Sequence, residues 1–86
     1  MNQGDLIADA ILTLATERGP DKTICPSEVA RHIAGQDQDK WRPLMPPIRA
    51  QALKLAEDGK VEIRKGGETV DLQTFSGIYR ITIRAG

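Results

Sequence analysis

Apolar residues recur with the period of an α-helix over the first eighteen residues of the chain. They lie on one side of a helix with 3.6 residues per turn, which is the pattern of a helix packed against a core. The apolar positions are Leu6, Ile7, Ala10, Ile11, Leu14 and Ala15. Gly19 and Pro20 follow, and proline cannot continue the helical hydrogen bonds. The pattern therefore predicts a first helix near residues 3–18.

A second, shorter helix is predicted over residues 26–34. Pro26 suits the first helical position because the N–H at that position has no partner within the helix. Cys25 then lies at the N-cap, and Glu28 lies where a carboxylate meets unpaired N–H groups. Gly35 ends the helix. The residues expected to face inward are Val29, Ala30, Ile33 and Ala34.

The third predicted helix, residues 46–58, must accommodate the pair Pro46–Pro47. Two prolines are excluded from a helix interior, since each removes a hydrogen bond and clashes with the preceding turn. We therefore expect Asp39–Leu44 to form a separate turn that carries Trp41, with Trp41 packed beneath the third helix. Gly59 ends this helix. The residues expected to face inward are Ile48, Ala52, Leu55 and Ala56.

After residue 59 the period of the apolar residues changes from 3.6 to 2, which indicates β-strands. Val61 and Ile63 alternate with charged residues as far as Gly66–Gly67. Two consecutive glycines suit a tight turn that needs positive φ angles. A hairpin closed by this turn places Ile63 opposite Val70.

A last strand is predicted within residues 78–84. The expected inward residues are Tyr79, Ile81 and Ile83, and the expected outward residues are Arg80, Thr82 and Arg84. The connector before the second helix also has room for one short β-bridge at Thr23–Ile24. The order is helix, short strand, two helices and three strands. We therefore expect an α+β fold of winged helix-turn-helix type, with three helices and a small antiparallel sheet in a single domain spanning residues 1–86.

Four stretches of the chain resemble a family of small bacterial proteins of unknown function. The stretches are TICPSEVAR, WRPLMPPIR, GKVEIRKGG and GIYRITIR. The resemblance covers nearly the whole chain and implies a winged-helix fold. It implies no substrate and no catalytic residue.

The charges divide unevenly along the chain although they sum to zero. Residues 1–39 carry a net charge of −4, and residues 40–86 carry +4. This asymmetry suits a surface that faces a polyanion, but solvated charges clustered by chance give the same pattern. The single cysteine excludes an internal disulfide, and the N-terminus lacks the basic segment of a signal peptide. No apolar run approaches the roughly 20 residues that span a bilayer. We therefore expect a cytoplasmic protein without a membrane partner.

No residue set in the sequence encodes a reaction. Cys25 lies at a helix N-terminus among unpaired N–H groups, but a nucleophile also needs a base within hydrogen-bond reach. The sole histidine, His32, lies about 10 Å further along the helix axis. We interpret Cys25 as a small apolar residue or weak cap, and His32 as a surface residue. One Cys and one His do not make a metal site. The sequence therefore predicts a non-enzyme without cofactor, metal or small-molecule substrate.

Binding remains as the function. In winged-helix DNA-binding proteins the third helix enters the major groove and the hairpin, or wing, contacts the backbone. The residues predicted to contact nucleic acid are Arg42, Arg49, Lys54, Arg64 and Lys65. The outer face of the third helix also carries Ala50 and Glu57, which read bases poorly. A protein-protein interaction or dimerisation module is the alternative.

Overall fold

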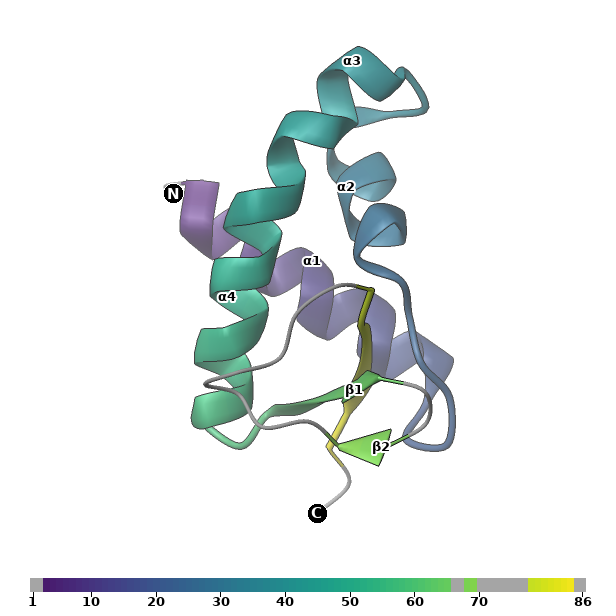
Figure 1. Ribbon diagram of the computed structural model, residues 1–86, viewed down its shortest axis with the longest axis vertical. Helices are drawn as coiled ribbons and strands as arrows, with labels where there is room; N and C mark the ends of the chain where they lie inside the picture. The colour runs from purple at the N-terminus through teal and green to yellow at the C-terminus, as the bar shows by residue number, and fades with distance from the viewer. Residues whose placement is uncertain (1–2, 66–67, 70–77, 85–86) are drawn as a thin grey trace.

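The computed structural model describes residues 3–65, 68–69 and 78–84. Helices come first along the chain and an antiparallel sheet follows, so the fold is of the expected α+β class (Figure 1). The elements are α1 (Gln3–Arg18), α2 (Pro26–Ala34), α3 (Gln38–Trp41), the 3₁₀ turn η1 (Arg42–Leu44), α4 (Met45–Glu57), β1 (Val61–Lys65), β2 (Glu68–Thr69) and β3 (Arg80–Ile83). Within these ranges, no helix has the length and apolar character needed to cross a membrane.

The predicted bounds of α1 are confirmed, but its buried stripe is narrower than expected. Ile7, Ile11 and Ala15 are buried where α1 packs against α2, α4 and β3. Leu6, by contrast, is 47% exposed, and Leu14 is half-buried. A residue next to Ile7 is rotated by about 100° around the helix, so Leu6 lies beyond the edge of the packed face.

The start of α2 is fixed by its first four residues, and the predicted bounds are confirmed. Cys25 is the N-cap residue, and its backbone N–H donates to Glu28 Oε1 at 3.2 Å. The other carboxylate oxygen of Glu28 accepts from Arg18 Nη2 at 2.6 Å. Glu28 therefore ties the end of α1 to the start of α2. At the far end of α2, Gly35 has a φ of 88°, which favours glycine.

The proline-rich segment is helical almost throughout, in three pieces. Asp37 caps α3 by accepting from the backbone N–H of Asp39 at 3.0 Å. The predicted separate turn corresponds to α3 and η1, and α4 begins at Met45, one residue before the expected start. Pro46–Pro47 lies in the first turn of α4, where missing N–H donors cost least. Inside α4, Ile48, Ala52 and Leu55 are buried as expected, whereas Ala56 is only partly buried.

The sheet has the strand order β2-β1-β3 and is antiparallel throughout. In the hairpin, Arg64 pairs with Thr69 and Lys65 with Glu68. The expected partner of Ile63 in that hairpin, Val70, lies outside the described residues. On its other side, β1 pairs with β3 from Val61↔Ile83 to Arg64↔Arg80.

The predicted bridge in the connector is present, because Ile24 pairs with Ile81 on the free edge of β3. The Ile24 N–H donates to the Ile81 carbonyl at 2.7 Å, and the Ile81 N–H donates to the Ile24 carbonyl at 2.9 Å. Both side chains are fully buried. The bridge therefore joins the α1–α2 connector to the last strand.

The expectation that Thr82 faces solvent is wrong, since its residue is only 2% exposed. Its hydroxyl donates to the carbonyls of Lys22 at 2.6 Å and Pro20 at 3.2 Å. The connector thus covers the outer side of β3 at this position. Ile83, expected to face inward, is only half-buried near the end of the strand.

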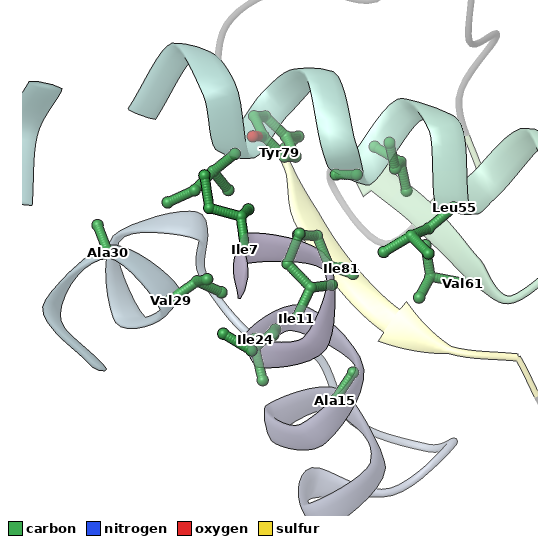
Figure 2. Close-up of a cluster of buried hydrophobic side chains, with 14 residues drawn as sticks. Ile7, Ile11, Ala15, Ile24, Val29, Ala30, Leu55, Val61, Tyr79 and Ile81 are labelled. Atoms are coloured by element: carbon green, nitrogen blue, oxygen red, sulfur yellow. The ribbon is translucent and has the colours of Figure 1, made fainter. Parts of the chain in front are cut away.

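The core lies between α1, α2, α4 and the sheet, and isoleucine supplies most of its bulk. The largest fully buried apolar side chains are Ile7, Ile11, Ile24, Ile48, Ile63, Ile81, Val29 and Val61. In Figure 2, Ile7, Ile11 and Ile81 converge from a helix and a strand, with Tyr79 at the margin of the cluster. The chain has only three aromatic residues, so branched aliphatic side chains must fill this space.

We predict that Glu28→Ala lowers the free energy of unfolding by about 1–2 kcal/mol, because the change removes a capping acceptor and a partly exposed ion pair. Burial acts to raise the pKa of Glu28, but the Cys25 N–H and Arg18 outweigh it, and the net pKa is lowered from 4.5. The contribution is therefore present above pH 4.5 and is lost as the pH falls through the lowered pKa. Urea unfolding at several pH values measures it. An alanine variant as stable as the parent at neutral pH would contradict the prediction.

For Thr82, we expect Thr82→Val to cost about 1–3 kcal/mol, because it keeps the shape of the side chain and removes the donor from two carbonyls. Thr82→Ser is the matched control, since it retains the hydroxyl and loses one methyl group. Thermal or urea unfolding compares the two variants. If valine is tolerated better than serine, the hydroxyl does not hold the connector on β3.

Candidate functional site

Three of the five basic residues singled out from the sequence lie on η1 and α4. Arg42 and Lys54 are exposed. They are twelve positions apart, which is roughly 18 Å along a helix. Arg49 is half-buried, and its guanidinium carbon lies 5.9 Å from the ring centroid of Tyr79. A cation at this distance over an aromatic face is attracted to it. Arg49 therefore lies over Tyr79, the residue directly before β3.

The other two predicted residues, Arg64 and Lys65, end β1. Arg64 Nη2 lies 2.9 Å from Glu62 Oε2, so a neighbouring carboxylate partly neutralises this arginine. Lys65 is exposed. Side chains alternate along a strand, and Ile63 is buried against the core. Arg64 therefore lies on the outer face of the sheet, on the opposite side from α4.

Arg80 belongs with this second group, although the sequence did not single it out. It is the direct partner of Arg64 in the β1–β3 pair. Arg80 Nε donates to Thr23 Oγ1 at 2.5 Å, and Nη2 donates to the Thr23 carbonyl at 3.3 Å. Pairing the two apolar strands through Ile63 and Ile81 would have placed the two arginines opposite each other, so the signal was present in the alternation.

The five predicted residues therefore form two groups, not one strip. Arg42, Arg49 and Lys54 lie on η1 and α4, whereas Arg64 and Lys65 lie at the end of β1, with Arg80 beside them. Within the described part of the chain, α4 packs on the inner side of β1. The two groups consequently approach a common ligand only around the edge of the sheet.

An apolar pocket opens between the start of α2, the α3–α4 segment and the residues that lead into β3. Its volume is about 320 Å³. The lining residues are Cys25, Pro26, Ser27, Trp41, Met45, Ile78 and Tyr79. Ile78 at the rim is 84% exposed, the more exposed of the two large apolar side chains that face solvent in the described ranges.

Trp41 forms one wall of this pocket, which corrects its expected place beneath the third helix. The indole is only half-buried, and it packs against the margin of the core from α3. The guanidinium carbon of Arg31 lies 5.6 Å from the ring centroid. The short α3 precedes α4 and lies at the far end of the molecule from β2, so it brings Trp41 to the surface (Figure 1).

Cys25 and His32 lie in different places. The Cys25 thiol is half-buried in the apolar pocket, with Sγ 3.1 Å from Ser27 Oγ. His32 is exposed and lines a separate hollow with Leu6 and Asp9. In the parts of the chain that the structure covers, no three His, Cys, Asp or Glu side chains gather as metal ligands would.

Among the described residues, Tyr79 is the titratable group whose pKa is shifted most. Burial raises the pKa of its phenol to about 12, although the nearby charge of Arg49 acts in the opposite direction. The phenol therefore stays neutral at physiological pH. Tyr79 serves as an uncharged wall between the core and the apolar pocket.

The comparison with protein families gives one result. A family model described as "Protein of unknown function (DUF3253)" matches residues 4–84. The chain therefore belongs to this family. No curated protein matches the chain.

We predict that Tyr79 makes the protein less stable between about pH 10 and 12. The folded-state pKa is raised above the ordinary tyrosine value of 10.0, so the contribution is complete below pH 10 and is lost as the pH rises towards 12. Two pKa units correspond to roughly 3 kcal/mol. Tyr79 is the only tyrosine, so the ultraviolet absorbance of tyrosinate reports its titration directly. Tyr79→Phe should lose this part of the alkaline instability, and titration of the native phenol near pH 10 would contradict the prediction.

Proposed function

We propose that this DUF3253 protein is a non-enzymatic binding module of winged-helix type that contacts DNA through α4 and the β1–β2 hairpin. The order of elements supports the fold. A bridge strand at Ile24 lies between α1 and α2, and β1 and β3 follow α4. The bridge, β3 and β1 are neighbours in that order. In this proposal, the β1–β2 hairpin that follows α4 acts as the wing.

The observation that carries the proposal is the pairing of Arg64 with Arg80 on the outer face of the sheet. Like charges directly opposite each other destabilise an antiparallel pair. Glu62 offsets only part of this cost, since it pairs with Arg64 alone. Two arginines at paired positions on the outer face of the sheet, with Lys65 at the end of β1, suit the phosphate oxygens of a nucleic-acid backbone.

The α4 surface supports contacts that position DNA and gives little support for base reading. Arg42 and Lys54 are exposed and suit phosphate contacts. On the same helix, Ala50 and Glu57 are exposed and offer no donor suited to a base edge in the major groove. Arg49 is drawn towards Tyr79. We therefore propose binding that depends mainly on the phosphate backbone, is weak for a single copy and depends strongly on salt.

A second candidate function is protein binding, which the apolar pocket favours. An exposed apolar surface next to a hollow is typical of interaction sites. The pocket wall contains Trp41 and Tyr79, and tryptophan and tyrosine are enriched at protein interfaces. This function uses a surface different from the Arg64–Arg80 pair.

Titration of mixed-sequence duplex DNA at several salt concentrations tests the first proposal. Each phosphate contact contributes a slope of about −0.9 in log affinity against log salt, so Arg42, Arg49, Arg64 and Lys65 together predict a slope near −4 at most. Arg64→Ala combined with Lys65→Ala should flatten the slope by roughly two units. Adding Arg80→Ala should flatten it further.

The matched control replaces two exposed lysines elsewhere, Lys22 and Lys60, with alanine, and so causes the same change in net charge. This control should leave a steeper slope than the Arg64 and Lys65 double variant. Equal slopes for the two variants would mean that DNA senses net charge alone. Absence of binding even at millimolar protein and low salt would rule out the nucleic-acid function.

A further inference from the structure

We propose that the apolar pocket receives a bulky apolar side chain from an acidic segment of another protein. The inference rests on the second candidate function and specifies the partner. The pocket is defined by Trp41, Met45, Ile78 and Tyr79, with Cys25 and Pro26 at the start of α2. Its volume of about 320 Å³ is at the lower end of the roughly 300–1,000 Å³ of small-molecule sites, which suits one or two side chains.

The chemistry of the wall favours an apolar occupant. The described lining residues carry three polar side-chain groups: the phenol of Tyr79, the thiol of Cys25 and the hydroxyl of Ser27. Tyr79 is only 6% exposed. The thiol and the hydroxyl contact each other at 3.1 Å. A nucleobase would lose the hydration of its polar edges in such a pocket without comparable hydrogen bonds. A leucine or phenylalanine side chain has no such cost.

Covering the exposed side chain of Ile78 would contribute to the free energy of binding at the pocket. Most of its surface is in water at 84% exposure. Burying an aliphatic side chain of this kind is worth roughly 1.5–3 kcal/mol. A segment that fills the hollow would also cover Ile78, and so would gain this contribution in addition to that of its own side chain.

The charge around the pocket identifies the partner as acidic. Arg31 lies 5.6 Å from the ring centroid of Trp41, and Arg49 lies 5.9 Å from that of Tyr79. Each aromatic wall thus carries a guanidinium, and none of the lining residues in the described part of the chain is acidic. Carboxylates that flank the inserted side chain would complement the guanidinium of Arg31 over Trp41.

The same charges disfavour a second copy of this chain. In a two-fold symmetric interface, Ile78 of each copy could enter the pocket of the other. That arrangement would bring Arg31 and Arg49 of both copies into one interface, without an acidic side chain among the pocket residues that the structure describes. Like charges brought together in this way are unfavourable, so an acidic partner fits better than a dimer.

Peptide titration of the full chain tests this inference. The probe is Glu-Asp-Leu-Phe-Asp-Glu with blocked ends, and the control peptide replaces its four acidic residues with lysine. Trp41 is the only tryptophan, so its fluorescence reports occupancy, and calorimetry measures the affinity independently. We expect the acidic peptide to bind at least about tenfold more tightly than the lysine peptide.

Two variants locate the site. Ile78→Asp and Arg31→Glu should each weaken binding of the acidic peptide by about tenfold or more. Leu6→Asp and Lys22→Glu are the matched controls, since they change an exposed apolar side chain and an exposed cation elsewhere. The controls should bind like the parent. All four positions are at least partly exposed, and circular dichroism confirms that each variant folds.

Three results would overturn the inference: equal affinity for the two peptides, no change in Trp41 at millimolar acidic peptide, or displacement of the peptide by single-stranded DNA. Sedimentation that shows a dimer lost in Ile78→Asp would also overturn it, and would assign the pocket to a second copy. The DNA titration uses the Arg64 and Lys65 variants, so failure of the peptide site leaves the nucleic-acid proposal separately testable. A dimer would keep protein contact as a function.

Discussion

The backbone bridge between Ile24 and Ile81 is the contact on which the rest of the arrangement depends. It joins the connector between α1 and α2 to the last strand. The side-chain hydrogen bond from Arg80 to Thr23, which are 57 positions apart in the sequence, joins the same two segments. The side chains of Ile24 and Ile81 are buried in the same core. Because Cys25 follows Ile24 directly, the bridge also fixes where α2 begins. The start of α2 in turn forms one wall of the apolar pocket.

Polar contacts on the outer side of the sheet reinforce this bridge. Thr82 donates to two carbonyls of the connector, and Arg80 donates to Thr23 just before the bridge. Thr82 thus gives these carbonyls a hydrogen-bond donor where no strand continues the ladder. The connector is therefore attached to β3 in two ways. Its Ile24 side chain packs in the core, and its carbonyls and Thr23 accept hydrogen bonds on the outer side of the sheet.

The sequence predicted the elements well because each has a local cause. Helical periodicity fixes α1, Pro26 and Glu28 fix the start of α2, and Pro46–Pro47 fixes the start of α4. Residues at the surface of the core were predicted less well, since their burial depends on a distant segment. Thr82 alternates as an outward residue should, but the connector covers it.

The two candidate surfaces meet at the start of β3, where consecutive side chains point to opposite sides. Tyr79 faces the core and lines the apolar pocket, and the guanidinium of Arg49 lies over its ring. Arg80 faces outward and pairs with Arg64. A strand alternates its side chains with period 2, so one short segment serves both surfaces, although Arg49, a predicted DNA contact, also lies over the ring of Tyr79 beside the pocket. The sequence indicated this alternation in GIYRITIR, but only the pairing of β3 with β1 and the position of Trp41 reveal what each side faces. Occupation of the pocket would therefore leave the Arg64–Arg80 pair accessible, and the two binding functions are compatible within one chain.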